Sequence, residues 1–323
     1  MASRRVSAKA PATIANVGPG FDVFCLAIRG PSDAVSLREA NEDSLRVEGP
    51  EASSISTRFT ENTAGIVVNA LRRATGIETP LEIVVTKGIP AGRGLGSSAA
   101  SCAAAALAFL KLYPETSRLG PTGVLQAAVE GEAAVAGRHY DNLAGALLGG
   151  FVTIASTEPI VLGREPVSPR IHLAVAVPDF VLKTAEMRRV LPETVSLRDA
   201  VSNVGKAATL ALALARGDAE LAGRCLEDRF AEPKRAPFLS GYGDAKAAAL
   251  GAGAAGFAIS GSGSTVFAIA ASDKKAEQSA KAMQDAFRAR KVNANAFTST
   301  VDNSIPLRSL LGNRGPRFSL VTE

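Results

Sequence analysis

A segment rich in glycine and serine separates a predicted strand from a predicted helix in the first third of the chain. Residues 81–85 are apolar and mostly β-branched, which is typical of a strand. Residues 101–111 contain neither glycine nor proline and consist of strong helix formers. The segment between them contains Pro90, Ala91, Gly92, Arg93, Gly94, Leu95, Gly96, Ser97 and Ser98. Glycines let backbone N–H groups approach an anion, and Ser97 or Ser98 could cap the positive end of the helix. The pattern predicts a phosphate-binding loop; a plain turn with serine caps is the structural alternative.

Length and composition favour a soluble protein of two domains. The chain has 323 residues, of which 46% are hydrophobic and 21% charged. No apolar run approaches the ~18 residues of a membrane span, and the basic N-terminus lacks the long apolar core of a secretion signal. Cys25, Cys102 and Cys225 show no metal-ligand spacing and are expected to be buried free thiols in a reducing cytosol. We therefore expect a cytoplasmic protein with no membrane partner.

The net charge of +5 raises the question of a nucleic-acid partner. The basic residues are dispersed, and the chain offers only three tyrosines and no tryptophan for base stacking. A mildly basic solvated surface is the simplest interpretation, and an anionic small substrate is also compatible. No nucleic-acid partner is expected.

Two further segments carry polar side chains in apolar, glycine-rich surroundings. Asn16 and Asp22 flank a turn forced by Gly18-Pro19-Gly20; local Asx turns are the structural alternative to a ligand role. Residues 122–136 are expected to form a helix that carries Glu130 and Glu132, which at i, i+2 do not share a face. At most one of these carboxylates therefore points into a site. The cluster that follows contains His139, Asp141 and Asn142.

The second half is expected to begin after the proline-rich segment 159–169. A strand at 171–177 opens it, and helices at 196–216 and 218–228 follow. Residues 251–256 form a literal GxGxxG, but they follow a helix and precede a strand, the reverse of the order in a dinucleotide-binding fold. A helix at 276–290 and a strand at 294–301 close this half. The last twenty residues are expected to form a mobile tail or an interface arm.

The loop resembles neither common nucleotide fingerprint, because no lysine follows its glycines and its spacing is not GxGxxG. It does resemble the phosphate loop of the GHMP kinases, Pro-x-x-x-Gly-Leu-Gly-Ser-Ser-x-Ala, without a gap. Residues 10–22, Ala-Pro-Ala-Thr-Ile-Ala-Asn-Val-Gly-Pro-Gly-Phe-Asp, resemble the N-terminal signature of the homoserine kinase branch. The resemblance extends to His139-x-Asp-Asn, Thr184-x-x-x-Arg-x-x-Leu-Pro, Glu232-Pro-x-Arg and the loop at 260–263, and so covers residues 8 to about 303.

The resemblance implies a GHMP two-domain α+β architecture. A nucleotide-binding half like ribosomal protein S5 domain 2 would span residues 1–165, and a ferredoxin-like half residues 166–323, with the site in the cleft between them. The implied reaction transfers the γ-phosphate of ATP to the side-chain hydroxyl of L-homoserine, giving O-phospho-L-homoserine for threonine biosynthesis. We also expect a homodimer.

The resemblance also implies roles for individual residues. ATP would be bound by the loop residues 90–98 and by Asn62, Lys87, Gly261, Ser262 and Gly263. Ser98 and Glu132 would bind Mg²⁺ through hard oxygens, with Glu130 as the alternative carboxylate.

For the acceptor, Asp22 would bind the ammonium group of the substrate. Arg188 and Arg235 would bind its carboxylate. Asn16, His139 and Asn142 would position its hydroxyl. Asp141 is a candidate base, although phosphoryl transfer can rest on positioning alone.

Two alternatives stay open at this stage. The substrate could be another small alcohol of the shikimate or mevalonate type, which would not need the ammonium-binding carboxylate of Asp22. The chain could also be a non-catalytic nucleotide-binding sensor on the same fold, although its complete phosphate loop and Glu132 argue against that.

Overall fold

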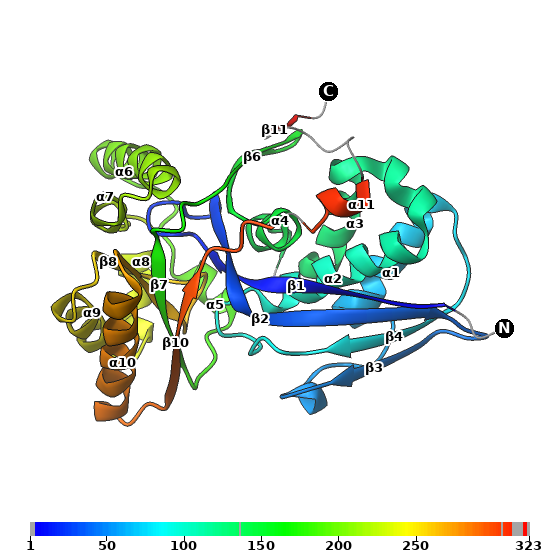
Figure 1. The fold of residues 1–323 in the computed structure, drawn as a ribbon, viewed down its shortest axis with the longest axis horizontal. Helices are drawn as coiled ribbons and strands as arrows, with labels where there is room; N and C mark the ends of the chain where they lie inside the picture. Colours follow the sequence, from blue (N-terminus) through cyan, green and yellow to red (C-terminus); the bar gives the residue numbers. More distant parts are fainter. Residues whose placement is uncertain (1–3, 136, 305, 312–318, 322–323) are drawn as a thin grey trace.

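The computed structural model describes residues 4–135, 137–304, 306–311 and 319–321. Its first half is built on a seven-stranded sheet in the order β11-β6-β5-β2-β4-β3, with β1 paired to β2 (Figure 1). The strands are β1 (Arg5–Ala15), β2 (Phe24–Glu39), β3 (Ser44–Glu48), β4 (Leu81–Thr86), β5 (Phe151–Thr157), β6 (Ile160–Glu165) and β11 (Ser319–Val321). The long strand β2 pairs with β1, β4 and β5, and therefore holds this sheet together.

Helix α2 (Ser97–Leu112) is the centre of the first half. It packs against β1 and β2 on one side and against the other helices of this half on the other. These are α1 (Thr63–Thr75), α3 (Gly120–Ala133) and α4 (Asp141–Leu148), with the 3₁₀ turns η1 (Ala52–Ser54) and η2 (Pro114–Leu119). Every residue from Ala99 to Leu110 is buried, so α2 has no polar face. Its many alanines let strands and helices approach it closely from all sides.

The second half is a four-stranded antiparallel sheet in the order β10-β7-β9-β8. Its strands are β7 (His172–Pro178), β8 (Gly256–Ile259), β9 (Val266–Ala270) and β10 (Ala294–Thr300). Its helices are α5 (Thr184–Arg189), α6 (Leu197–Arg216), α7 (Ala219–Arg224), α8 (Glu232–Arg235), α9 (Tyr242–Gly251) and α10 (Asp273–Ala289), with the 3₁₀ turn η3 (Ala236–Phe238). Numbered along the chain, these strands follow the order 4-1-3-2. The expected ferredoxin-like half is confirmed.

Three expectations differ from the structure. Helix α2 begins at Ser97 rather than at residue 101, and no side chain caps it, since Gly96 stands at the N-cap. The proline-rich segment 159–169 is not simply a boundary, because β6 lies within it. The chain end also returns to the first half: α11 (Arg308–Leu311) packs on α2 and η2, and β11 pairs with β6.

The packing of the C-terminal segment on the first half affects the expected domain limits. The division at residues 165 and 166 separates the two sheets but not the C-terminal segment, and the limits themselves stay a prediction. Parts of the expected tail, residues 312–318 and 322–323, lie outside the described residues, as does Ala136 at the end of the expected helix 122–136. The three cysteines are free and buried, as expected. Within the described ranges, no helix is long and apolar enough to cross a membrane.

Candidate active site

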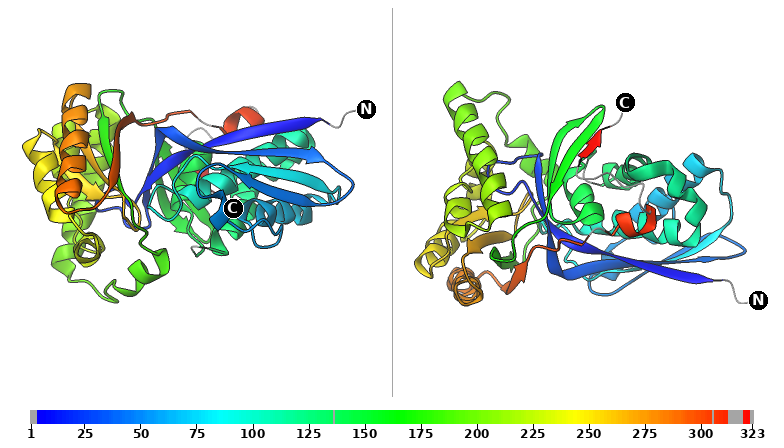
Figure 2. Two further views of the ribbon diagram at one scale, coloured as in Figure 1. Left: turned by 90° about the horizontal axis from the view of Figure 1, so that it is seen from below. Right: turned by 45° about the horizontal axis from the view of Figure 1, so that its top comes forward.

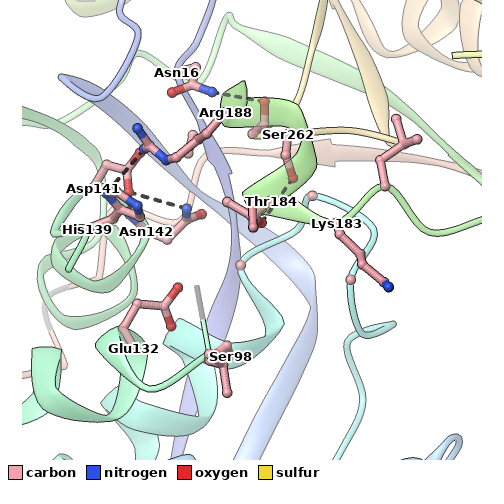
Figure 3. Close-up of a pocket in the computed structure, with 18 of the residues that line it drawn as sticks. Asn16, Ser98, Glu132, His139, Asp141, Asn142, Lys183, Thr184, Arg188 and Ser262 are labelled. Atoms are coloured by element: carbon pink, nitrogen blue, oxygen red, sulfur yellow. Dashed lines mark hydrogen bonds between the residues drawn. The ribbon is translucent and has the colours of Figure 1, made fainter. Parts of the chain in front are cut away.

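A cavity of about 390 Å³ lies between the two halves, and most of the predicted site residues line it (Figure 3). Its first-half residues include Asn16, Asp22, Gly92, Gly94, Gly96, Ser98, Glu132, His139, Asp141 and Asn142. Its second-half residues include Lys183, Thr184, Arg188, Arg235, Gly261 and Ser262. Segments up to 245 residues apart thus meet here, for example through the bond from Asn16 Nδ2 to the carbonyl of Gly261 at 2.9 Å.

The glycine-rich loop is held tightly by both halves of the molecule. The hydroxyl of Ser260 donates to the carbonyl of Gly94 at 2.5 Å. A Cβ atom at Gly94, whose φ is +81°, would lie 2.3 Å from the carbonyl oxygen of Ser260. A Cβ at Gly96, with φ +65°, would lie 2.0 Å from Thr13 Oγ1. Both positions therefore require glycine, because space and backbone conformation exclude any side chain.

A buried ion pair that the sequence did not reveal lies beneath this loop. Asp33 is fully buried, and its Oδ1 accepts hydrogen bonds from the backbone N–H groups of Gly88 (3.0 Å) and Ile89 (3.1 Å). Its Oδ2 accepts from the ammonium group of Lys87 and from the hydroxyl of Ser101 at 2.7 Å. The charge of Lys87 is thus already compensated from below the loop. Its expected role as a phosphate partner stays a prediction.

Other predicted nucleotide residues have structural partners of their own. Asn62 caps α1 by accepting from the N–H of Ala64 at 2.9 Å. Ser97 Oγ donates to the carbonyl of Ile89 at 2.9 Å. Arg93 pairs with Asp179 of the second half at 2.6 Å and also with Glu51. A second cavity, of about 190 Å³, shares Gly92, Ser98 and Val135 with the first and is also lined by Ile55, Asn62, Thr63, Val85, Lys87, Ala91, Ser97 and Ser101.

Ser98 and Glu132 leave buried oxygens unpaired on the wall of the first cavity. Among the described residues, neither Ser98 Oγ nor Glu132 Oε2 has a hydrogen-bond partner. Burial raises the pKa of Glu132 to about 7; the neighbouring Ser98 hydroxyl partly offsets that shift, and the charge of Asp141 adds to it. Unpaired buried oxygens are costly unless something binds them. Glu130, by contrast, pairs with Arg73 and does not line the cavity.

This pair of oxygens fits a magnesium ion. No group of three or more His, Cys, Asp or Glu side chains able to hold a metal occurs in the described part of the chain. Magnesium at a phosphoryl-transfer site commonly takes only one or two protein ligands and completes its coordination with water and substrate phosphates. One carboxylate and one hydroxyl beside a phosphate loop are such a donor set.

Asp141 and Asn142 begin helix α4 at the floor of the cavity. Asp141 Oδ1 accepts from the N–H of Asn142 at 2.7 Å, and Asn142 Oδ1 accepts from the hydroxyl of Thr13, also at 2.7 Å. Burial, partly offset by the Asn142 hydrogen bond, raises the pKa of Asp141 to about 6. Near neutral pH this carboxylate is therefore mostly ionised but can still take up a proton.

Charged side chains from both halves meet at the opposite wall of the cavity. Arg188 binds Asp22 with two hydrogen bonds, of 3.0 and 2.6 Å, and donates to Nδ1 of His139 at 3.2 Å. Arg235 is buried beside them and donates to the carbonyl of Gly261 at 2.9 Å. Both guanidinium groups stack on the ring of Phe21, at 5.4 Å for Arg188 and 5.1 Å for Arg235. Burial, reinforced by the charge of Arg188, lowers the pKa of Arg235 to about 10.

Asn16 spans the turn to Asp22 with a side-chain bond six residues long in sequence, instead of the expected Asx turn, and also contacts the second half. Its Oδ1 accepts from the N–H of Asp22 at 3.0 Å while its Nδ2 donates to Gly261. Asn16 and Asp22 have φ values of 69° and 58°, a conformation that Asn and Asp tolerate better than other side chains. This bond holds the turn in a shape that presents both Asn16 and Asp22 to the cavity.

Asp228 supports this wall, although no motif in the sequence singles it out. The buried Asp228 accepts from the N–H groups of Phe230, Ala231 and Glu232 at the start of α8, and from Asn203 Nδ2 of α6 at 2.7 Å. Since α8 carries Arg235 at its end, Asp228 fixes the position of that arginine. Asp228 lies three residues before Ala231, the N-cap of α8, and no motif in the sequence marks these bonds.

Comparison with known proteins agrees with this geometry. Residues 62–150 match the model of the GHMP kinases N terminal domain, and residues 210–289 that of the GHMP kinases C terminal domain. The chain is 42% identical over 252 residues to a homoserine kinase of Halorubrum lacusprofundi, covering 78% of this chain and 82% of the relative. It is 39% identical over 246 residues to a homoserine kinase of Methanococcus maripaludis, covering 75% and 80%.

Solved structures give the same result. The crystal structure of homoserine kinase from Cytophaga hutchinsonii superposes with a TM-score of 0.85 at 34% identity and covers 93% of this chain and 96% of that one. A mevalonate kinase from L. major has the same fold, with a TM-score of 0.64 at 15% identity over 94% of this chain and 98% of that one. The chain belongs to the GHMP kinase family and, within it, to the homoserine kinases.

Proposed function

We propose that this protein transfers the γ-phosphate of ATP to the side-chain hydroxyl of L-homoserine and releases O-phospho-L-homoserine and ADP. The observation that carries the proposal is the division of the cavity into two chemically different walls. One wall has a phosphate loop beside unpaired buried oxygens of Ser98 and Glu132. The other gathers Asp22, Arg188 and Arg235, which offer both signs of charge to a zwitterion.

The nucleotide would bind along the glycine-rich loop. Backbone N–H groups at the start of α2 and the positive end of that helix favour the phosphates. Ser98 and Glu132 would hold Mg²⁺, which neutralises charge on the transferring phosphoryl group. The raised pKa of Glu132 supports this assignment, because a carboxylate built for a cation is destabilised until that cation arrives.

The amino-acid head of homoserine would bind at the opposite wall. Asp22 would accept hydrogen bonds from the ammonium group, and Arg188 and Arg235 would bind the carboxylate. Because Arg188 and Asp22 are paired with each other in this structure, the substrate exchanges one charged partner for another rather than meeting bare charges. This exchange lowers the cost of desolvating the site before binding.

The hydroxyl would then lie near the floor of the cavity. Asn142, His139 and Asn16 are suited to orient it toward the phosphate loop. Asp141 can accept the proton as the new O–P bond forms, but a loose transition state needs little proton abstraction beforehand. Most of the rate enhancement therefore comes from positioning and electrostatic stabilisation.

An assay of ADP release tests the proposal. Purified protein with ATP and Mg²⁺ should release ADP when L-homoserine is added, and phosphorus NMR should show a phosphomonoester on the side-chain oxygen. Shikimate and mevalonate should release little ADP under the same conditions. ADP release that is unaffected by L-homoserine would contradict the proposal.

A further inference from the structure

The buried carboxylate of Asp33 connects the two ends of the phosphate loop. Asp33 lies on β2, and the helices of the first half lie on one side of the long strands β1 and β2 (Figure 2, right). Its side chain points toward that side, because its Oδ2 accepts from Ser101 of α2 at 2.7 Å. Its Oδ1 accepts from the N–H groups of Gly88 and Ile89, just before the loop, at 3.0 and 3.1 Å. One carboxylate therefore contacts both the entry of the loop and the helix that follows it.

The ammonium group of Lys87 completes this connection. Lys87 Nζ donates to Asp33 Oδ2. It also donates to the carbonyl of Ser97, at 3.1 Å, and to the hydroxyl of Ser101, at 2.8 Å. An ammonium group has three N–H donors, and all three are thus used inside the protein. A phosphate could bind Lys87 only by breaking one of these bonds.

This cluster is closed to water and held by close backbone contacts. Asp33 is 0% exposed and Lys87 is 7% exposed. A Cβ atom at Gly88 would lie 2.4 Å from the carbonyl oxygen of Ser32, and one at Gly49 would lie 2.3 Å from that of Lys87. The removal of one partner of such a buried pair leaves the other charge unpaired, whereas the removal of both charges is often tolerated. The two side chains are therefore expected to act as a unit.

The loop that this pair holds faces the space that the nucleotide would occupy. Gly92, Gly94 and Gly96 line the active-site cavity, and Lys87 and Ser97 line the smaller cavity beside it. Backbone N–H groups bind phosphates well only when several of them converge on the same anion. A shift of either end of the loop would spread these groups apart and weaken the binding of phosphates.

We propose that Asp33 is a positioning residue for the nucleotide, which acts through Lys87 and the two ends of the phosphate loop. Lys87 then supports nucleotide binding by fixing the loop, and it does not contact a phosphate itself. This role differs from the phosphate contact that the resemblance implies for Lys87. The proposal rests on the proposed function, because that function places the nucleotide on this loop.

Calorimetric titration of the full chain with MgADP, without an acceptor, tests this role. Asp33→Asn keeps an oxygen for the N–H groups of Gly88 and Ile89 but turns an amide NH₂ group toward the ammonium group. The dissociation constant of the folded variant for MgADP should rise at least about tenfold, and Lys87→Met should have a similar effect. Asp228→Asn is the matched control and should bind MgADP like wild type. It changes another buried carboxylate that accepts backbone N–H groups, but in the second half.

The double variant Asp33→Asn/Lys87→Met separates positioning from phosphate contact. It leaves no unpaired charge, so its affinity for MgADP should lie within about fivefold of wild type. A larger loss would mean that Lys87 binds a phosphate and would overturn the proposal, even if neither single variant folds. An Asp33→Asn protein that is less stable in urea but binds MgADP like wild type would also overturn it, because the role of Asp33 would then be purely structural. Since no acceptor is present, a failure of the homoserine assay remains distinguishable from a failure here.

Discussion

The two walls of the active-site cavity differ in whether their charged side chains are paired within the protein. On the phosphate side, Ser98 Oγ and Glu132 Oε2 are buried and accept or donate no hydrogen bond within the described chain. On the acceptor side, Asp22 and Arg188 neutralise each other through two hydrogen bonds. The phosphate side therefore offers oxygen ligands to a cation, whose charge would compensate that of Glu132. The acceptor side is prepared for a zwitterion that replaces an existing ion pair.

The two walls therefore differ in how much they lower the stability of the folded protein. A buried carboxylate destabilises the protein when it is ionised and its burial is only partly compensated, as the raised pKa of Glu132 indicates. A pair of partly exposed charges costs little, because water and the partner both stabilise them. We therefore expect substitutions on the phosphate side to lower activity while they raise the free energy of unfolding. Substitutions on the acceptor side should weaken substrate binding without a gain in stability.

Loss of the Glu132 carboxylate should have the largest effect. Glu132→Gln should lower turnover about 10³–10⁴-fold, or ~4–5.5 kcal/mol, because charge on the transferring phosphoryl group is no longer neutralised. Ser98→Ala should act in the same direction. Steady-state ADP release measures both. Glu130→Gln is the matched control, since its side chain pairs with Arg73 outside the cavity. An inactive Glu130→Gln beside an active Glu132→Gln would reverse the assignment of the metal ligand.

Truncation of the acceptor-side arginines should come next. Arg188→Ala and Arg235→Ala should each cost ~2–5 kcal/mol in kcat/KM for L-homoserine, because one partner of a desolvated charge contact is lost. ATP affinity, measured by calorimetry, should be nearly unchanged in both variants. Phosphorylation of homoserine at wild-type efficiency by both variants would remove the physical basis for this binding mode.

The same Glu132→Gln change should stabilise the protein in the absence of metal. The folded-state pKa of Glu132, about 7, lies above its ordinary value of 4.5, so the folded state binds this proton more tightly than the unfolded state. The cost of ionising Glu132 is absent below pH 4.5, grows as pH rises toward 7, and is complete above 7. Urea unfolding without Mg²⁺ should therefore show a gain of up to about 3 kcal/mol at pH 8 and almost none at pH 4.5. Equal gains at both pH values would mean that the charge of Glu132 is not the cause.

The smallest effect is expected at Asp141. Asp141→Asn should reduce kcat only about tenfold, whereas loss of an essential general base typically costs about 10²–10⁴-fold. The pH dependence of kcat in wild type should show a modest fall near pH 6, where Asp141 takes up a proton. A loss as large as that of Glu132→Gln, with unchanged substrate affinity, would make Asp141 the base.

The parts of the site that the sequence predicts correctly are continuous motifs. The loop at 90–99 and the strand–loop–strand at 256–270 each carry their geometry in consecutive residues, so their positions could be predicted. The start of α2 differs from the expectation. Serine side chains usually favour caps, yet Gly96 takes the cap position and Ser97 Oγ donates to the carbonyl of Ile89 instead.

Contacts between distant segments could not be predicted in this way. Asp33 lies 54 residues from Lys87 in a strand, with no motif around it, and only the folded sheet shows that the two meet. Asp228 and Asn203 are similar, since their bond joins a loop to the inner face of α6. The pairing of Asp22 with Arg188 also depends on how the two halves meet, which no local pattern encodes.

The most direct test of the contrast between the walls compares three acceptors on the wild-type protein. L-Homoserine carries both charges, 4-hydroxybutanoate lacks the ammonium group, and 3-aminopropan-1-ol lacks the carboxylate. Because each analogue leaves a charged group of the site unpaired, kcat/KM for ADP release should fall about 10²-fold or more for both. ATP affinity should be the same throughout. If either analogue is phosphorylated as efficiently as L-homoserine, the acceptor wall does not recognise a zwitterion and the account is wrong.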